Sequence, residues 1–248
     1  YSTSGSRYFS SAVSGWRYNS SYPTKVIFKS GRIIDNIVNA PNLRSSCYIG
    51  AVSIFNDSSS YVSGLEMSGG LIENNQVLTA VNPGYTPTYG GALMNYNGDV
   101  NISGGIIRGN EGGYGSAIYH YSYYPATSRM ILSGGQITGN KFNRSGQTPT
   151  ENRSQIYISY FGMELGGGGA DIQDNIYLNQ TYGAIKISDH IYQPGRLYRI
   201  YLNQGTNSNQ FKKGSVVVEP DGNKVTSVTE YLPYFQVRSN PYVIEAGR

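Results

Sequence analysis

Paired carboxylates are the first chemistry to look for, because glycoside hydrolysis needs two carboxyl groups roughly 5 to 9.5 Å apart. A short motif recurs along the chain and ends in Ile-x-x-Asn; the position just before its Asn is acidic in the first copy, Asp35, and in the last, Asp174. If the copies stack as neighbouring strands, these acids lie four spacings apart, about 19 Å. Only Asp35 and Glu73 fall on adjacent copies, and a solvated edge accounts for them.

Histidine is the other common acid–base group near neutral pH, and the chain has two, His120 and His190. Most lone histidines are ordinary surface or strand residues. The single cysteine, Cys47, excludes a disulfide within the chain and a Cys-rich zinc site. No acidic cluster of the calcium-binding type is present. We therefore predict no catalytic residue, no metal and no cofactor, and we favour a non-enzymatic protein.

Tyrosine is the residue type in clear excess, with 24 copies in 248 residues. Tyr side chains are enriched at recognition surfaces, where a flat ring and a hydroxyl contact sugars or proteins. Four of them fall within six residues, and alternate strand positions point to opposite faces, so some must meet solvent. The predicted ligand-binding residues are Tyr96, Tyr119, Tyr121, Tyr123 and Tyr124.

A possible aromatic column extends this cluster, because Phe55, Tyr96, Tyr121 and Tyr160 occupy one position of a second, looser repeat. If the column points inward, it is core packing. If it points outward, it is a flat platform for a ligand. An error of one residue in the alignment inverts this choice, so both alternatives stay open.

Composition limits the classes of protein to consider. Charged residues are only 14% of the chain and the net charge is +4, with Lys and Arg scattered rather than clustered, so no nucleic-acid partner is expected. No apolar run approaches the roughly 20 residues of a membrane span, so no membrane insertion is expected. The start of the sequence has no signal-peptide pattern, and the chain reads as a monomeric domain excised from a larger protein.

The elements that would position these residues follow from the repeat. Ser68-Gly69-Gly70 with Ile72 and Asn75 is echoed at Ser103 to Asn110 and at Ser133 to Asn140, and two weaker copies end at Asn36 and Asn175. The spacing between copies varies while the motif holds. That behaviour is typical of a solenoid, in which loops absorb insertions without breaking the stack.

Each motif residue has a mechanical role in such a stack. The Ile of each copy is expected to point inward and stack on the next, the Gly pair to allow a sharp bend between two sheets, and the terminal Asn to stack amide on amide. The predicted columns are Ile33, Ile72, Ile107, Ile137 and Ile172, and Asn36, Asn75, Asn110, Asn140 and Asn175.

The Ser-Gly-Gly-x-Ile-x-x-Asn copies, with Gly-Gly-Ala-Leu at 90 to 93, resemble the repeats of bacterial surface proteins with pectin-lyase-like right-handed β-helices. They are also similar to polymorphic outer-membrane adhesin repeats, although Ile stands here where those favour Phe, which suggests closer kinship with cell-wall-anchored proteins of gut Firmicutes. The likeness covers roughly residues 26 to 178. It implies an extracellular, cell-surface location and often adhesion, but no particular ligand.

The predicted fold is therefore all-β, a single-stranded right-handed parallel β-helix with irregular terminal coils or caps. Residues 1–25 are expected to form an N-terminal cap or first coil, 26–178 the repeats, and 179–248 final coils and a C-terminal β cap. The predicted function is a non-catalytic adhesin or binding module that recognises a glycan or a host or bacterial surface protein. Two alternatives remain: a polysaccharide lyase or glycoside hydrolase with loop carboxylates, and a passive spacer.

Overall fold

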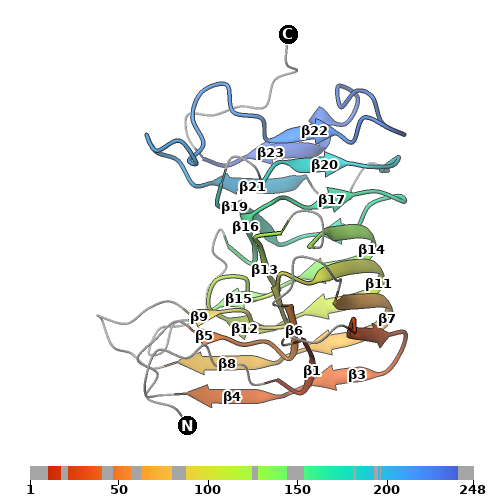
Figure 1. Ribbon diagram of the computed structural model, residues 1–248, viewed down its shortest axis with the longest axis vertical. Coiled ribbons are helices and arrows are strands. Elements are labelled where there is room, and N and C mark those ends of the chain that lie inside the picture. The colour runs from red at the N-terminus through yellow and green to blue at the C-terminus, as the bar shows by residue number, and fades with distance from the viewer. Residues whose placement is uncertain are drawn as a thin grey trace.

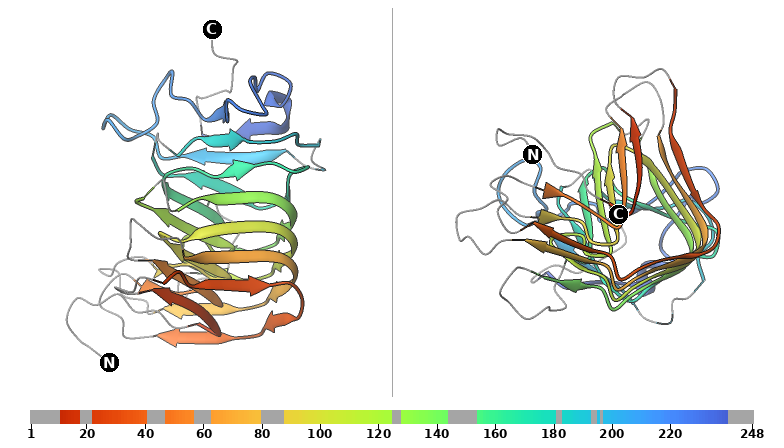
Figure 2. Two further views of the ribbon diagram at one scale, coloured as in Figure 1. Left: turned by 45° about the vertical axis from the view of Figure 1, so that its right-hand side comes forward. Right: turned by 90° about the horizontal axis from the view of Figure 1, so that it is seen from below.

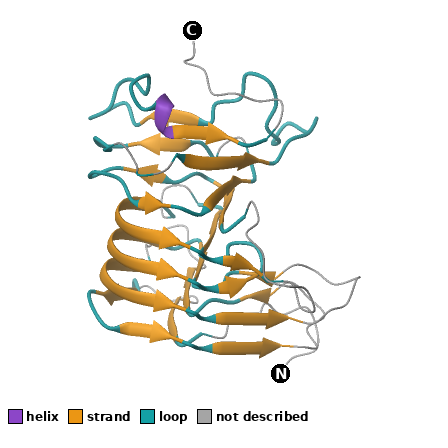
Figure 3. Cartoon of the chain, turned by 180° about the vertical axis from the view of Figure 1, so that it is seen from behind, coloured by secondary structure: helices purple, strands orange, loops and turns teal. Residues whose placement is uncertain are grey.

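A computed structural model describes the chain at residues 11–17, 22–40, 47–56, 63–79, 88–124, 128–143, 154–180, 183–192, 195 and 197–239. These residues form strands and loops, with one short 3-10 helix, η1 (Leu232–Tyr234), among them (Figure 3). Neighbouring strands pair in parallel throughout the described sheets. The all-β prediction is confirmed.

An eight-stranded sheet runs the length of the molecule and uses its strands in chain order (Figure 1). Its strands are β1 (Val13–Arg17), β6 (Val52–Asn56), β10 (Leu93–Tyr96), β13 (Ile118–Ser122), β16 (Ile156–Tyr160), β19 (Asn175–Leu178), β21 (Tyr198–Leu202) and β23 (Phe235–Val237).

A nine-stranded sheet lies beside it and again follows chain order. Its strands are β2 (Lys25–Phe28), β3 (Arg32–Ile34), β7 (Gly64–Glu73), β11 (Asp99–Arg108), β14 (Met130–Thr138), β17 (Glu164–Leu165), β18 (Asp171–Ile172), β20 (Ile185–Ile187) and β22 (Val218–Pro220). Two smaller sheets hold β4 (Ile37–Ala40), β8 (Gln76–Thr79), β12 (Glu111–Gly112) and β15 (Lys141–Phe142), and the pair β5 (Cys47–Tyr48) and β9 (Thr88–Tyr89).

The chain visits these sheets in turn, and we call one such passage a coil. Up to β15, each coil runs from the eight-stranded sheet to the nine-stranded sheet and then to the four-stranded sheet. After β18 the chain returns directly to the eight-stranded sheet, and the described residues of the later coils form no strand of a third sheet. Figure 2 shows the coils stacked along one axis, an arrangement compatible with a β-helix-like fold.

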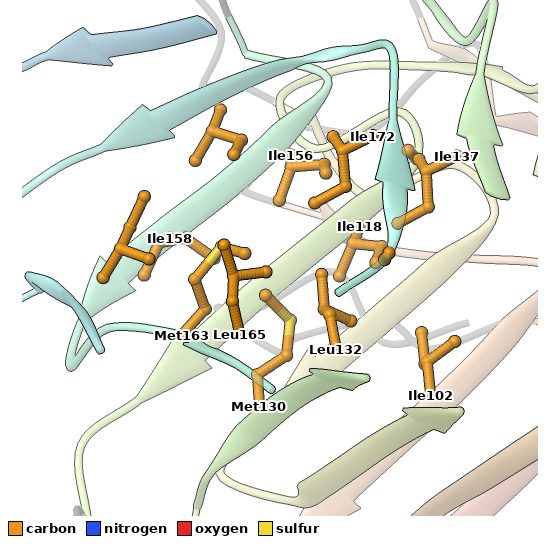
Figure 4. Packing of buried hydrophobic residues seen from close by; sticks show 14 of the residues in the cluster. Ile102, Ile118, Met130, Leu132, Ile137, Ile156, Ile158, Met163, Leu165 and Ile172 are labelled. Atoms are coloured by element: carbon orange, nitrogen blue, oxygen red, sulfur yellow. The ribbon is translucent and has the colours of Figure 1, made fainter. Parts of the chain in front are cut away.

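The predicted Ile column is present in register. Ile72 pairs with Ile33 on one side and Ile107 on the other, and Ile137 connects Ile107 to Ile172. From Ile72 onward the column is at most 1% exposed and belongs to one continuous core between the large sheets (Figure 4). Stacking identical β-branched residues on successive strands buries their side chains almost completely, which makes this column a main source of stability.

The Gly pairs bend the strands, but within one sheet rather than between two. β7, β11 and β14 each run through their Ser-Gly-Gly segment, and the pairing register shifts there as in a β-bulge. The second Gly has a positive φ, for example 90° at Gly105. The first Gly lies against the neighbouring coil, since a Cβ on Gly104 would fall 2.5 Å from the carbonyl oxygen of Ser68. Both positions therefore require glycine, for different reasons.

Replacing Gly104 by alanine should lower the free energy of unfolding by roughly 2–3 kcal/mol, because the new methyl group must push a neighbouring backbone away. Gly139→Asn is the matched control. Gly139 has φ 66° with open space around it, and Asn74 adopts φ 54° at the equivalent position. This variant should differ from wild type by less than about 0.5 kcal/mol. Urea unfolding measures both, and equal stabilities for the two variants would contradict the steric explanation.

The terminal asparagines form a hydrogen-bonded ladder, which we call the Asn ladder. The side-chain Nδ2 of each donates to the Oδ1 of the next: Asn36 to Asn75 at 2.7 Å, Asn75 to Asn110 at 2.8 Å, and Asn110 to Asn140 at 2.8 Å. The prediction that Asn175 is the fifth member is wrong. Asn140 donates instead to Oδ2 of Asp174 at 2.6 Å, while Asn175 begins β19.

The fifth copy departs because its turn is one residue shorter. In the first four copies a residue with positive φ precedes the Asn, namely Asp35, Asn74, Gly109 and Gly139. The fifth copy lacks this residue, so Asp174 itself reaches the ladder and the four-stranded sheet ends there. The deletion is hidden in the sequence because Asn175 still stands three residues after Ile172, as the ladder Asn does in the other copies.

The segments beyond the repeats also carry strands. β1 lies in the first 25 residues, and β20 to β23 extend both large sheets through residue 237. At the far end Tyr231 and Phe235 are buried beside η1 and close the core. The domain boundaries at 25/26 and 178/179 stay predictions.

Candidate functional site

The eight-stranded sheet has two buried faces. Leu93, Ile118 and Ile156 pair in register and point into the main core. The residues that follow them, Met94, Tyr119 and Tyr157, lie on the opposite face and belong to a separate aromatic cluster. The strand alternation thus sends the tyrosines away from the main core.

This outward face is nevertheless covered. Tyr48 of β5 and Tyr89 of β9 stack on one another with ring centroids 5.1 Å apart, and the ring of Tyr89 lies 4.7 Å from that of Tyr119. Burial raises the pKa of Tyr89 to about 12 and that of Tyr119 well above its usual value. The two-stranded sheet and its tyrosines therefore act as a lid over the middle of the sheet.

The aromatic column is a tight stack. The rings of Phe55 and Tyr96 lie 5.1 Å apart and within 16° of parallel, and those of Tyr96 and Tyr121 lie 4.6 Å apart and within 3°. Trp16 pairs in register with Phe55 and extends the column toward β1. The faces of the central rings contact neighbouring rings, so these faces are not available to stack on a sugar.

The column does not continue to Tyr160 in register, which corrects the alignment of the looser repeat. Tyr121 pairs with Ser159, and Tyr160 pairs with Ser122. The error arose because Ile156, rather than Tyr157, is the counterpart of Ile118. The preceding loop has no Ala to mark the position.

Tyr160 still contacts the column, but with a turned ring. Its centroid lies 5.1 Å from that of Tyr121 at 72°, and 5.7 Å from that of Tyr123 at 80°. Tyr124 packs edge-on against Tyr123 at 80°. We call these four residues, Tyr121, Tyr123, Tyr124 and Tyr160, the aromatic corner.

The aromatic corner offers open ring surface. Tyr123 is 55% exposed, and the other three rings are half-buried. Tyr160 has a φ of 75°, a left-handed conformation that costs a bulky residue about 1 to 3 kcal/mol and is typical of functional positions. Desolvation raises the pKa of Tyr121, and a hydrogen bond with Tyr160 adds to the effect. The Tyr121 hydroxyl therefore stays protonated at neutral pH and acts as a neutral polar group.

Backbone hydrogen bonds hold the corner in place. The N–H of Tyr123 donates to Oδ1 of Asn97 at 2.7 Å, and the N–H of Asn97 donates to the carbonyl oxygen of Tyr121 at 2.7 Å. Oγ of Ser122, buried below the rings, donates to the carbonyl of Ser128 at 2.8 Å. The rings therefore project from a rigid turn.

The five predicted site residues separate into two groups. Tyr121, Tyr123 and Tyr124 come together in the aromatic corner. Tyr96 and Tyr119 are only 6% and 3% exposed and lie beneath other rings. Tyr160 is a further member that sequence reasoning placed in the column; the one available signal was its position directly after a buried strand. Binding of a ligand by these residues stays a prediction.

Of the acidic candidates, Glu73 is paired with arginines, Asp174 ends the Asn ladder, and Asp35 is exposed. Glu73 Oε1 lies 2.5 Å from Nε of Arg108, and its Oε2 lies 3.7 Å from Arg32. Glu164 accepts two hydrogen bonds from Arg129, at 3.0 and 2.8 Å. Asp35 lies in an exposed turn. These ion pairs are cross-strand contacts between coils and give no sign of a free acid and base facing one another.

The two histidines lie in opposite environments. His120 is fully buried, its Nδ1 is 2.7 Å from Nδ2 of Asn95, and desolvation lowers its pKa to about 3. Such a group does not exchange protons near neutral pH. His190 is exposed, with its Nδ1 2.5 Å from the hydroxyl of Tyr231 and 4.0 Å from Glu230.

Within the described ranges, no three His, Cys, Asp or Glu side chains gather where a metal ion would bind. The described strands and loops also include no helix with the length and hydrophobicity needed to cross a bilayer. No protein-family model matches the chain, and neither a curated protein nor a solved structure matches it.

Proposed function

We propose that this chain is a non-catalytic binding module of an extracellular bacterial surface protein, and that the aromatic corner contacts its ligand. The chain is then a single right-handed parallel β-helix of the pectin-lyase-like class. Stacked repeats and strands used in chain order support this finer description of the fold. The resemblance of the repeats to bacterial surface proteins supports the location and the adhesive role.

The observation that carries the proposal is the change in ring orientation at the corner. From Phe55 through Tyr96 to Tyr121 the rings are nearly parallel and cover one another's faces. Tyr160, in contrast, is turned by 72° from Tyr121 and by 80° from Tyr123. A turned, half-exposed ring presents a face to solvent, and the nearby hydroxyls offer hydrogen bonds. This combination favours a glycan, whose C–H groups stack on aromatic faces and whose hydroxyls need polar partners.

The test is a glycan array followed by calorimetry with the double variant Tyr123→Ala and Tyr124→Ala. We expect binding to weaken at least about tenfold, because interface tyrosines often contribute more than 1 kcal/mol each. The melting temperature should stay unchanged, because these side chains lie outside the core. Tyr192→Ala is the matched control, since Tyr192 is 75% exposed but lies outside the corner, and it should bind as wild type does.

Other outcomes distinguish the alternatives. Unchanged affinity in the double variant, or lower stability with retained binding, would refute the corner as the site. Shortening of a polysaccharide would favour the lyase or hydrolase. Binding to a protein but to no glycan would identify the ligand as a host or bacterial surface protein. No binding to either glycans or proteins would favour a passive spacer.

A further inference from the structure

The end of the stack at β1 is an edge of three sheets. β1, β2 and β4 are the last strands of their sheets, and β3 pairs only with β7. In the described part of the chain, the outer edges of these strands are therefore unpaired. Backbone N–H and C=O groups on such an edge are ready to pair with another strand.

The interior of this first coil is also incompletely covered. Val26, Phe28 and Ile33 are only half-buried. Their partners in the next coil, Leu65, Met67 and Ile72, are at most 2% exposed. The same contrast holds for Val13 against Val52 and for Val38 against Val77. Among the described residues, no further coil packs on this apolar cross-section of the core.

The Asn ladder gives this end a direction and a chemistry. Each Oδ1 in the ladder accepts two N–H groups from the preceding Asn, its Nδ2 and its backbone N–H; at Asn110 the donors are both on Asn75, at 2.8 and 3.0 Å. Asn36 donates to Asn75 in the same way. Among the described residues, none donates to Oδ1 of Asn36. This oxygen is placed to accept from one more Asn.

The opposite end of the ladder is closed. Asp174 accepts a hydrogen bond from Asn140. As a carboxylate it has no Nδ2 group, so it cannot donate to a further member of the ladder. The Asn ladder does not continue past Asp174 among the described residues, and the later coils finish under Tyr231 and Phe235, which are 2% and 6% exposed. The end at β23 is covered by residues of the chain itself. The end at β1 presents the same kind of surface that each later coil presents to the coil before it.

We infer that the end formed by β1 to β4 is a docking surface for one further coil of the same Ser-Gly-Gly-x-Ile-x-x-Asn repeat, joined to the chain ahead of β1. The Ile of that coil stacks on Ile33, and its Asn donates to Asn36. This interface continues the one already present between successive coils. It goes beyond the proposed binding function and does not depend on it.

A second copy of the chain fits this surface less well. Its covered end lacks a ladder Asn, and its open end brings one Asn36 Oδ1 toward another, so two acceptors face each other. Two acceptors without a donor leave both unsatisfied. The polarity of the ladder therefore selects a coil that ends in a donor.

The test inserts a copy of residues 93–117 between Ala12 and Val13 of the full chain. The insertion is in phase, because Val13 and Leu93 both pair with Val52, and Leu93 pairs with Ile118. Hydrogen exchange is measured at the backbone amides of residues 25–39. We expect exchange there to slow at least about tenfold, since edge amides become paired, while exchange in β14 stays unchanged.

The matched control carries the same insertion with Asp in place of the copied Asn110, which removes the Nδ2 donor and should lose most of the protection at residues 35–37. Unchanged exchange with an insert that proteases cut readily would overturn the inference. So would sedimentation that shows the unmodified protein as a dimer with residues 25–39 already protected, because a second copy would then occupy the surface.

Discussion

Replacing Ile107 by aspartate is expected to abolish folding of the whole domain. Ile107 is 1% exposed and lies between Ile72 and Ile137 in the Ile column. A carboxylate there has apolar neighbours on both sides. Burying this group costs several kcal/mol even if it takes up a proton, and the loss of the Ile packing adds roughly 2–5 kcal/mol, which together match the roughly 5 to 15 kcal/mol that stabilise a typical domain. Circular dichroism and proteolysis of the expressed variant should show an unfolded chain.

Two milder variants show whether burial causes this loss. Ile107→Val removes one methyl group and should cost about 0.5–1.5 kcal/mol with the fold retained. Ser103→Asp places the same carboxylate on an exposed position of the same strand and should fold normally. A soluble, cooperatively melting Ile107→Asp protein would mean that the column is not the core.

Acid should destabilise the protein through His120, well above the range in which carboxylates titrate. The pKa of His120 is about 3 in the folded protein, whereas an unfolded histidine has a pKa of 6.5. Between these values the unfolded chain binds a proton that the folded chain refuses. Stability is therefore complete above pH 6.5 and falls by up to about 1.4 kcal/mol for each pH unit below it, until about pH 3.

The hydrogen bonds around His120 explain why the folded protein refuses the proton. Asn95 Nδ2 points at Nδ1 of His120, while Asn95 Oδ1 accepts from the N–H of Gly98. An imidazolium would place a donor against a donor, and its other nitrogen, Nε2, has no hydrogen-bond partner within the described structure.

Thermal melts between pH 7 and pH 4.5 measure the effect. Wild type should lose roughly 2–3 kcal/mol over this range. His120→Leu should remove the dependence, while His190→Gln, a change at the exposed histidine, should retain it. A wild-type melting temperature that is constant from pH 7 to pH 5 would show that His120 is protonated without cost.

Most of the fold could be predicted from the sequence, because each residue type in the repeat favours one structural role. The Ile column and the first four ladder asparagines lie as predicted, since both depend on spacing within a short motif. Asn175 was misplaced because a deletion in its turn leaves no mark beside Asp174. Tyr160 was misplaced by one residue because Ile156 and Tyr157 are adjacent and no Ala marks which of them is the counterpart of Ile118. Period-two alternation turns such a slip into the wrong face.

The aromatic face was harder to predict for a different reason. The strand pattern correctly indicates alternation, but it does not reveal that β5 and β9 bring Tyr48 and Tyr89 over the same face. Those residues are distant in sequence from Tyr119, and nothing in their local spacing indicates the contact. Whether a tyrosine is buried or open therefore depends on a loop whose path the repeat does not determine.

The stacking of coils along one axis also determines how the molecule responds to a mechanical load. β1 and β23 lie at opposite ends of the eight-stranded sheet, and the hydrogen bonds between coils run along the line that joins them (Figure 1). Tension applied between the ends pulls these bonds lengthwise, so one coil peels away before the next is loaded. Releasing the coil between Ile72 and Ile107 frees about 120 Å of chain, at roughly 3.5 Å per residue. A tether of this kind lengthens in steps at modest force and dissipates the applied mechanical energy gradually. A domain whose strands are loaded in shear would instead resist until it ruptures in one step.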